Sequence, residues 1–310
     1  MPTYRLTLEY EGTRYRGWQE QKNARTVAGE VRIALEKVAG RVSDLAGSGR
    51  TDAGVHAVAQ TAHARVLRPM DPERMRVAIN DILPADIHVL SLAPAPERFH
   101  ARHSAVSRSY LYQISLRRTA FAKRFVWWVK SPLDLATIRE AARLIPGRHD
   151  FALFCERPAD QTSTIVVVES ASVVTVGPLL LLRFVASHFL WRMVRRLVGV
   201  LVEIGRGRLK VADFAGLIEG TGFFAEGEGP AKWTAPPSGL FLERVLYPGD
   251  PPLPALAPAV PVVGGEGQVI APPARSSPQL EPPPVQRPRE LAGRPPIPRG
   301  DRAGRRSGSS

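Results

Sequence analysis

The feature that most limits the fold is an apolar stretch, residues 164–186, in which two strand-like runs are joined only by Gly177 and Pro178. Two residues leave no room for the crossover helix that a parallel pair of strands requires. Glu169 and Arg183 interrupt the stretch, so it predicts buried strands and not a membrane span. Neighbouring strands of this kind favour an α+β fold with a largely antiparallel sheet over a parallel α/β fold.

The rest of residues 1–248 mixes strand and helix patterns. Residues 4–10 alternate apolar and polar side chains, as strands do. Thr26 and Asp71 can each cap a helix, and Pro72 suits the first helical position. Further expected elements are a strand at 110–116, a helix at 135–142, strands at 164–176 and 179–186, a long helix at 188–204, a short helix at 211–218 and a strand at 240–247. Because each half contains strands and two helices, we expect two related subdomains, 1–103 and 104–248, that form one mostly antiparallel mixed sheet with helices packed on it.

The composition changes sharply after Pro248. Residues 249–310 hold 15 of the 29 prolines of the chain and neither an aromatic residue nor a lysine. Such a segment buries too little apolar surface to offset its ordering entropy. We therefore predict a disordered tail, rich in proline and arginine, over 249–310.

The chain is strongly basic, with 42 Lys and Arg against 29 Asp and Glu and a formal net charge of +13. Only +3 of this charge lies in 249–310, so +10 remains in residues 1–248. This balance favours a polyanionic partner, first nucleic acid and second an acidic membrane surface, although a charged surface also serves solubility.

Cysteine and histidine usage argues against a metal or disulfide scaffold. Cys155 is the single cysteine, so no internal disulfide or zinc cluster is possible, and a reducing compartment such as the cytoplasm is expected. The seven histidines show no metal-ligand spacing, and no dinucleotide fingerprint is present. We therefore expect neither a metal nor an organic cofactor.

One acidic residue stands out in the segment "SGRTDAGVH", residues 48–56, where Gly49 and Gly54 flank Asp52. The segment matches neither a P-loop nor a calcium loop. An Asx-type turn, in which Asp52 bonds its own backbone, is the simplest interpretation. An ionised carboxylate on a glycine-flanked loop can also act as a nucleophile, and the glycines would let a bulky substrate approach.

Six segments spread over 1–248 resemble, in order, signature segments of the tRNA pseudouridine synthase A family. They are "YRGWQEQ" (15–21), "GSGRTDAGVHA" (47–57), "FHARHSAVSRSYLYQI" (99–114), "GRHDFALFC" (147–155), "FLWRMVRRLVG" (189–199) and "APPSGLFLERVLY" (235–247). Agreement of this extent is far beyond chance. The tail at 249–310 lies outside the pattern of the family.

The resemblance implies a role for each matching residue. Asp52 corresponds to the essential aspartate nucleophile, and Tyr110 to the tyrosine that stacks on the target uracil. Arg195 corresponds to the basic residue that pairs with the carboxylate, and Arg50 to the arginine that helps to hold the flipped nucleotide. Leu242 lies where the family closes the pocket with an apolar side chain.

The resemblance also implies the reaction and the partners. It implies isomerisation of uridines 38–40 in the anticodon stem-loop of tRNA, in an active cleft between the two halves of a homodimeric, cofactor-free enzyme. The carboxylate would attack either C1′ of the ribose or C6 of the uracil, and both routes need it ionised. A guanidinium beside it is expected to lower its pKa. His56 is expected to brace the loop. The alternative is a non-catalytic RNA-binding protein on the same fold.

Overall fold

The computed structural model describes residues 1–156, 163–222 and 229–263. These described residues belong to one compact unit. The strands are β1 Thr3–Tyr10, β2 Val42–Gly47, β3 His56–Val66, β4 Ile87–Ala95, β5 Ser107–Ser115, β6 Trp127–Trp128, β7 Gly147–Asp150, β8 Ile165–Val176, β9 Leu179–Ala186 and β10 Leu240–Leu246. The helices are α1 Val27–Ala39, α2 Pro72–Asn80, α3 Leu135–Ala142, α4 Met193–Gly205 and α5 Val211–Glu219. Short 3₁₀ turns lie at Gly12–Arg14, Ala152–Phe154 and Pro237–Gly239.

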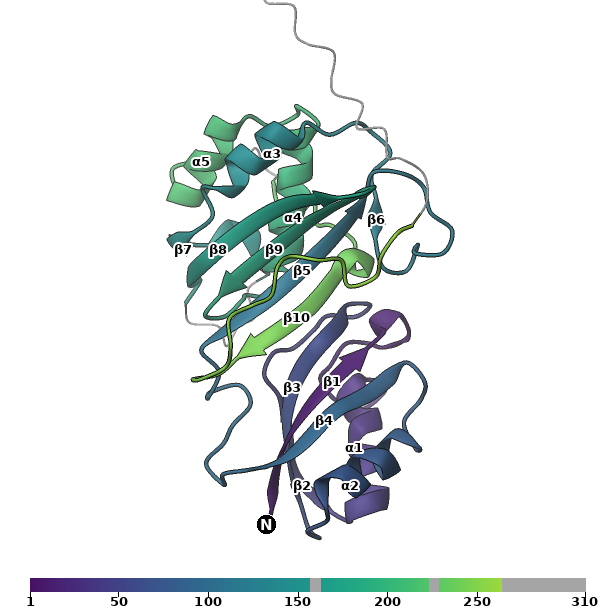
Figure 1. Cartoon of the computed structure of the whole chain (residues 1–310). Helices are drawn as coiled ribbons and strands as arrows, with labels where there is room; N and C mark the ends of the chain where they lie inside the picture. Colours follow the sequence, from purple (N-terminus) through teal and green to yellow (C-terminus); the bar gives the residue numbers. More distant parts are fainter. Residues whose placement is uncertain (157–162, 223–228, 264–310) are drawn as a thin grey trace, which may run out of the picture. The chain divides into compact units, whose positions relative to one another are not determined.

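All the strands belong to one sheet, and most of its pairs are antiparallel. The order is β4-β1-β3-β10-β5-β9-β8-β7, with β2 paired to β3 and β6 to β5 (Figure 1). Among the strands of the described residues, only the β3–β10 and β5–β6 pairs are parallel. The structure thus confirms the predicted α+β class. Strand β10 comes last in the chain, yet it lies between β3 and β5 and joins the early strands to the late ones.

The two helices of the first half begin at the predicted caps. The Thr26 hydroxyl accepts a hydrogen bond from the amide of Gly29 (3.3 Å), and the Asp71 carboxylate accepts one from the amide of Arg74 (2.9 Å). Pro72 occupies the first turn of α2, where its missing N–H costs nothing. Within the described residues, no helix is long and apolar enough to span a bilayer.

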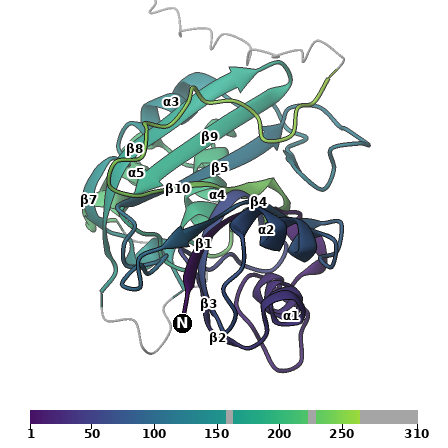
Figure 2. The same cartoon turned by 60° about the horizontal axis from the view of Figure 1, so that its bottom comes forward.

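Strands β5 and β9 are buried along their whole length, on both faces. On one face, Tyr110, Leu180 and Leu182 pack in the main core with the residues of α4. On the other face, Leu111 and Leu181 pack against a segment that follows β10. Both views show this segment running across the sheet (Figure 1 and Figure 2).

The first part of the predicted disordered tail is therefore ordered, which corrects the boundary at 249. Leu256 and Val260 cover the second sheet face. The buried Gln113 side chain accepts hydrogen bonds from the amides of Ala259 (2.7 Å) and Val260 (3.3 Å). The Arg183 guanidinium donates to the carbonyl of Pro254 (2.8 Å). The remainder of the predicted tail, 264–310, lies outside the described residues.

The long helix predicted at 188–204 starts later, at Met193. Arg192 has a φ of 62°, the only positive φ of a non-glycine residue in the described chain. A right-handed helix cannot include a left-handed residue, so 188–192 stay outside α4, and a turn in which the Met193 amide donates to the Leu190 carbonyl (3.1 Å) leads into the helix. This change of direction places residues 188–192 in one cavity wall with the loop of residues 48–55.

Candidate active site

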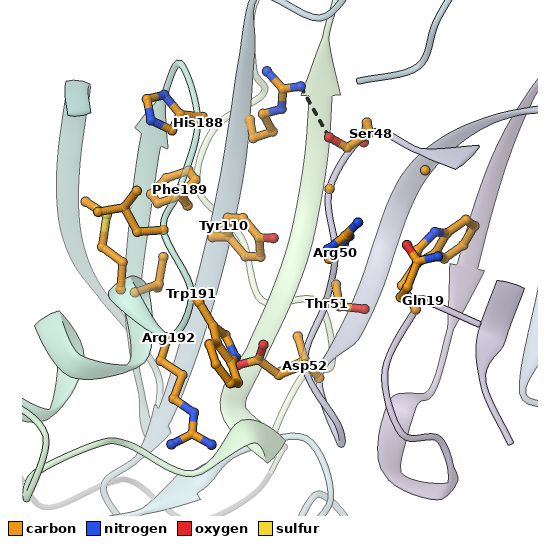
Figure 3. A pocket seen from close by; sticks show the side chains of 18 of the residues that line it. Gln19, Ser48, Arg50, Thr51, Asp52, Tyr110, His188, Phe189, Trp191 and Arg192 are labelled. Atoms are coloured by element: carbon orange, nitrogen blue, oxygen red, sulfur yellow. Dashed lines mark hydrogen bonds between the residues drawn. The ribbon is translucent and has the colours of Figure 1, made fainter. Parts of the chain in front are cut away.

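A cavity of about 1180 Å³ opens beside the "SGRTDAGVH" loop. Its walls come from residues within the segments 16–21, 46–55, 100–108 and 188–195, together with Tyr110, Ser163 and Leu240 (Figure 3). These segments belong to both halves of residues 1–248, and β10 holds the halves together.

The residues after β1 hold the loop from one side. The amide of Trp18 donates to the carbonyl of Thr51 (3.1 Å), and the amide of Gly54 donates to the carbonyl of Tyr15 (3.3 Å). Gly17 has a φ of 94°, and a β-carbon there would lie 2.4 Å from the Thr51 carbonyl oxygen. The "YRGWQ" motif therefore needs its glycine because the loop backbone lies directly against it.

Gln60 on β3 holds the first residues of the loop through its side chain. Sequence reasoning missed this residue. Its amide oxygen accepts from the Ser48 hydroxyl (2.7 Å), and its amide nitrogen donates to the carbonyl of Gly49 (2.8 Å). Gln60 has no exposed surface. The available signal in the sequence was a glutamine that follows the glycine-flanked loop by a few residues.

The buried Arg108 is a second residue that sequence reasoning missed. It donates to the carbonyls of Ser48 (3.2 Å; dashed line in Figure 3) and Ser187 (2.7 Å). It also donates to the carbonyls of Ala105 (3.4 Å) and Arg102. One guanidinium thus ties the loop of residues 48–56 to the segment that follows β9.

Arg195 is the partner of Asp52, although 143 residues separate them. Its Nη1 lies 3.4 Å from Oδ2 of Asp52. Its Nε donates to the carbonyl of Ala235 (2.7 Å), which fixes the direction of the guanidinium. Arg195 lies in the first turn of α4, and the left-handed Arg192 sets where that turn begins.

Burial raises the pKa of the Asp52 carboxyl above its ordinary value of 3.8. Arg195 lowers this pKa, and Arg192 and Trp191 add smaller lowering effects, but burial outweighs them. The expected lowering of the pKa by a guanidinium is confirmed, but burial outweighs it and the net shift is upward. The arginine limits the cost of burying the carboxylate and does not remove it.

Arg50 lies in the cavity wall with an exposed side chain. No hydrogen bond or ion pair joins its side chain to the described residues. Figure 3 shows it between Tyr110 and Gln19. Its guanidinium is therefore available to a ligand.

Tyr110 faces the loop from β5 and is 8% exposed. Phe189 meets its ring edge-on, with centroids 5.0 Å apart. A β-carbon at Gly49 would lie 3.7 Å from the Tyr110 hydroxyl, so this glycine keeps the space in front of the ring open. Burial raises the pKa of Tyr110, which keeps its hydroxyl protonated.

The structure does not bring Leu242 to the cavity wall. It has no exposed surface and pairs with Tyr110 across β10 and β5. Leu240, two residues earlier on the same strand, is the β10 residue among the described lining residues. Leu242 lies in the core beside Tyr110 because β10 is an interior strand of the sheet.

Two other loop residues have structural partners. The His56 ring accepts from the amide of Gly12 (3.0 Å) and lies 2.9 Å from the carbonyl of Arg124, so it braces the loop as expected. Burial lowers its pKa and keeps it neutral. Gly54 has a φ of 79° and packs on Pro237, so it supports the turn and does not face the cavity.

The cavity is strongly cationic. Of its described lining residues, six are arginines and the one acid is Asp52. The arginines are Arg16, Arg50, Arg102, Arg108, Arg192 and Arg195. No three histidine, cysteine, aspartate or glutamate side chains in the described part of the chain are placed to share a metal ion. A carboxylate can act as a nucleophile, and clustered arginines attract a polyanion such as a nucleic acid.

Comparison with known proteins shows the family to which this chain belongs. The profile of the tRNA pseudouridine synthase family matches residues 7–104 and 141–248. The tRNA pseudouridine synthase A of Beijerinckia indica subsp. indica is 40% identical over 253 residues, which are 81% of this chain and 95% of that protein. The namesake from Mesorhizobium japonicum is 39% identical, covering 80% of this chain and all of that protein. The one from Syntrophotalea carbinolica is 41% identical, covering 80% and 97%. This chain belongs to the tRNA pseudouridine synthase family.

Proposed function

We propose that this protein converts uridine to pseudouridine in the anticodon stem-loop of tRNA, at positions 38–40, with Asp52 as the nucleophile. The observation that carries the proposal is the Asp52–Arg195 pair, whose atoms lie 3.4 Å apart in a cavity with no other acid among its described lining residues. A protein that only binds RNA gains nothing from burying an isolated carboxylate, which costs stability.

The reaction is an isomerisation, so bonds and protons balance without a co-reactant. The Asp52 carboxylate adds to C1′ of the ribose or to C6 of the uracil, and the N1–C1′ bond breaks. The freed uracil turns, and C5 bonds to C1′. The proton on C5 leaves, N1 takes up a proton, and the carboxylate is released unchanged.

The neighbouring side chains have separate tasks in this scheme. Arg195 orients the carboxylate and stabilises its charge. Tyr110 offers its ring face to the extruded uracil, and Leu242 supports that ring from within the sheet. Arg50 is free to hold a phosphate beside the flipped nucleotide. The other arginines of the wall bind the RNA backbone, so affinity falls with added salt.

Three broader expectations remain proposals. The division into 1–103 and 104–248 fits the two groups of helices, α1 and α2 in the first part and α3, α4 and α5 in the second (Figure 1). A homodimer is carried over from the family resemblance, and light scattering of the purified protein tests it. A cytoplasmic location is inferred from the single, buried cysteine.

The test is to map pseudouridine in unmodified tRNA transcripts after incubation with the protein. Carbodiimide adducts stop reverse transcription at each pseudouridine. We expect stops at one or more of positions 38–40, and none with the Asp52→Asn variant. Tight binding of tRNA without any stop would favour the RNA-binding alternative.

A further inference from the structure

Trp191 is a large aromatic residue that the proposed reaction does not use. It lies in the cavity wall between the buried Leu190 and Met193, yet its side chain is 43% exposed. Figure 3 shows its indole ring beside the Asp52 carboxylate. A single exposed apolar residue is ordinary on a protein surface, so its position needs a second observation.

The backbone around Trp191 is built to hold the ring in the cavity. Arg192 adopts the left-handed conformation, which is unfavourable for an arginine and separates Trp191 from the first residue of α4. The carbonyl of Trp191 accepts a hydrogen bond from the amide of Glu156 (3.0 Å). The Glu156 carboxylate also pairs with the Arg192 guanidinium (2.8 Å). Strained backbone with such supports is common at functional sites.

The surroundings of the indole leave it a free surface toward the cavity. The guanidinium of Arg192 lies over the ring, 5.1 Å from its centroid. The Asp52 carboxyl lies at another side, where the indole helps to lower the pKa of that group. An aromatic ring with an arginine stacked on it is the combination that proteins use to stack unpaired RNA bases.

We propose that Trp191 is a base-stacking platform for a nucleotide that neighbours the target uridine in the RNA strand. When a base is extruded, its neighbours lose a stacking partner, and an aromatic ring beside the reaction centre replaces it. Tyr110 holds the extruded base deeper in the cavity, whereas Trp191 contacts the strand that remains outside. The proposal rests on the proposed function for the identity of the RNA, but its readouts do not need turnover.

The first measurement is the affinity for an anticodon stem-loop RNA at fixed salt. Loss of one stacked base weakens binding by about tenfold to a hundredfold. We expect this loss for Trp191→Ala and near-wild-type affinity for Trp191→Phe, which keeps an aromatic face. Trp128 is a matched control, because it is 40% exposed and lies under Arg118 (5.7 Å) but is not among the cavity residues. Trp128→Ala is expected to bind as the wild type does.

The second measurement places 2-aminopurine at the nucleotide on either side of the target uridine. Stacking quenches its fluorescence. We expect quenching at one of the two positions with wild-type protein and Trp191→Phe, and its loss with Trp191→Ala. Unchanged affinity and quenching in Trp191→Ala would overturn the proposal. A lower rate without any change in binding would also overturn it, since that result would mean that Trp191 acts only through its contact with Asp52. RNA binding without pseudouridine would refute the proposed function and leave the stacking result intact.

Discussion

Gly199 offers a way to displace Arg195 without touching it. Gly199 follows Arg195 by four residues on α4, so both lie on one face of the helix. A β-carbon at Gly199 would lie 1.6 Å from the carbonyl oxygen of Trp233 and 2.7 Å from its carbonyl carbon. Gly199→Ala therefore forces residues 233–235 away from α4 by roughly 1.5–2 Å, the distance needed to restore van der Waals contact.

This displacement breaks two hydrogen bonds between Arg195 and Ala235. In the first, Nε of Arg195 donates to the Ala235 carbonyl (2.7 Å). In the second, the Ala235 amide donates to the Arg195 carbonyl (3.0 Å). Overpacking costs about 1–3 kcal/mol, and each lost hydrogen bond about 0.5–1.5 kcal/mol. Alanine recovers about 1 kcal/mol through its helix propensity. We expect the free energy of unfolding to fall by about 1–5 kcal/mol, and turnover to fall about a hundredfold because the guanidinium is misplaced.

Urea unfolding measures the first effect, and single-turnover tritium release from tRNA labelled at C5 of uridine measures the second. Gly216→Ala on α5 is the matched control, because a β-carbon there meets its neighbours at 3.4 Å or more. This control is expected to keep full activity and to gain up to about 1 kcal/mol. If Gly199→Ala is as stable and as active as the control, the contact between α4 and 233–235 does not position Arg195.

Three other predictions concern the loop, the carboxyl and the segment after β10. Gln60→Leu leaves the Ser48 hydroxyl and the Gly49 carbonyl without their hydrogen bonds to Gln60. Urea unfolding should show that the free energy of unfolding falls by about 1–3 kcal/mol for each of these two polar groups. The rate of tritium release should fall on acidification with an apparent pKa above 3.8, since burial raises the pKa of Asp52, and Arg195→Met should move that pKa higher still. Truncation after residue 263 should leave the urea midpoint unchanged. Truncation after residue 248 should lower the free energy of unfolding by about 1.5–3 kcal/mol for each large apolar side chain that it uncovers. Equal midpoints for the two truncations would contradict the packing of this segment on the sheet.

Local patterns were sufficient for most elements of the sheet and for the helices with caps. Thr26 and Asp71 begin helices because their side chains satisfy free amides, a rule that depends only on neighbouring residues. The start of α4 was misplaced because a left-handed arginine leaves no mark in the sequence. The segment after β10 was taken for disordered chain because its prolines and lack of aromatic residues dominate its composition.

A signal for that segment was nevertheless present. The run "LLLLRFVA" of β9 is apolar at consecutive positions, and a strand of this kind is buried on both faces. The helices cover only one face, so some other part of the chain had to cover the second. In the site, the pairing of Asp52 with Arg195 depends on the insertion of β10 between β3 and β5, a long-range contact that only the family resemblance could suggest.

The central claim is that Asp52 performs nucleophilic chemistry on a tRNA uridine. The most direct measurement is tritium release from C5-labelled tRNA by Asp52→Asn, with tRNA affinity and urea unfolding measured on the same protein. Because the raised pKa shows that the buried charge costs stability above pH 3.8, the amide variant should be at least as stable as the wild type at neutral pH. The account predicts a folded variant that binds tRNA and releases no tritium. Release at a rate near that of the wild type would contradict it.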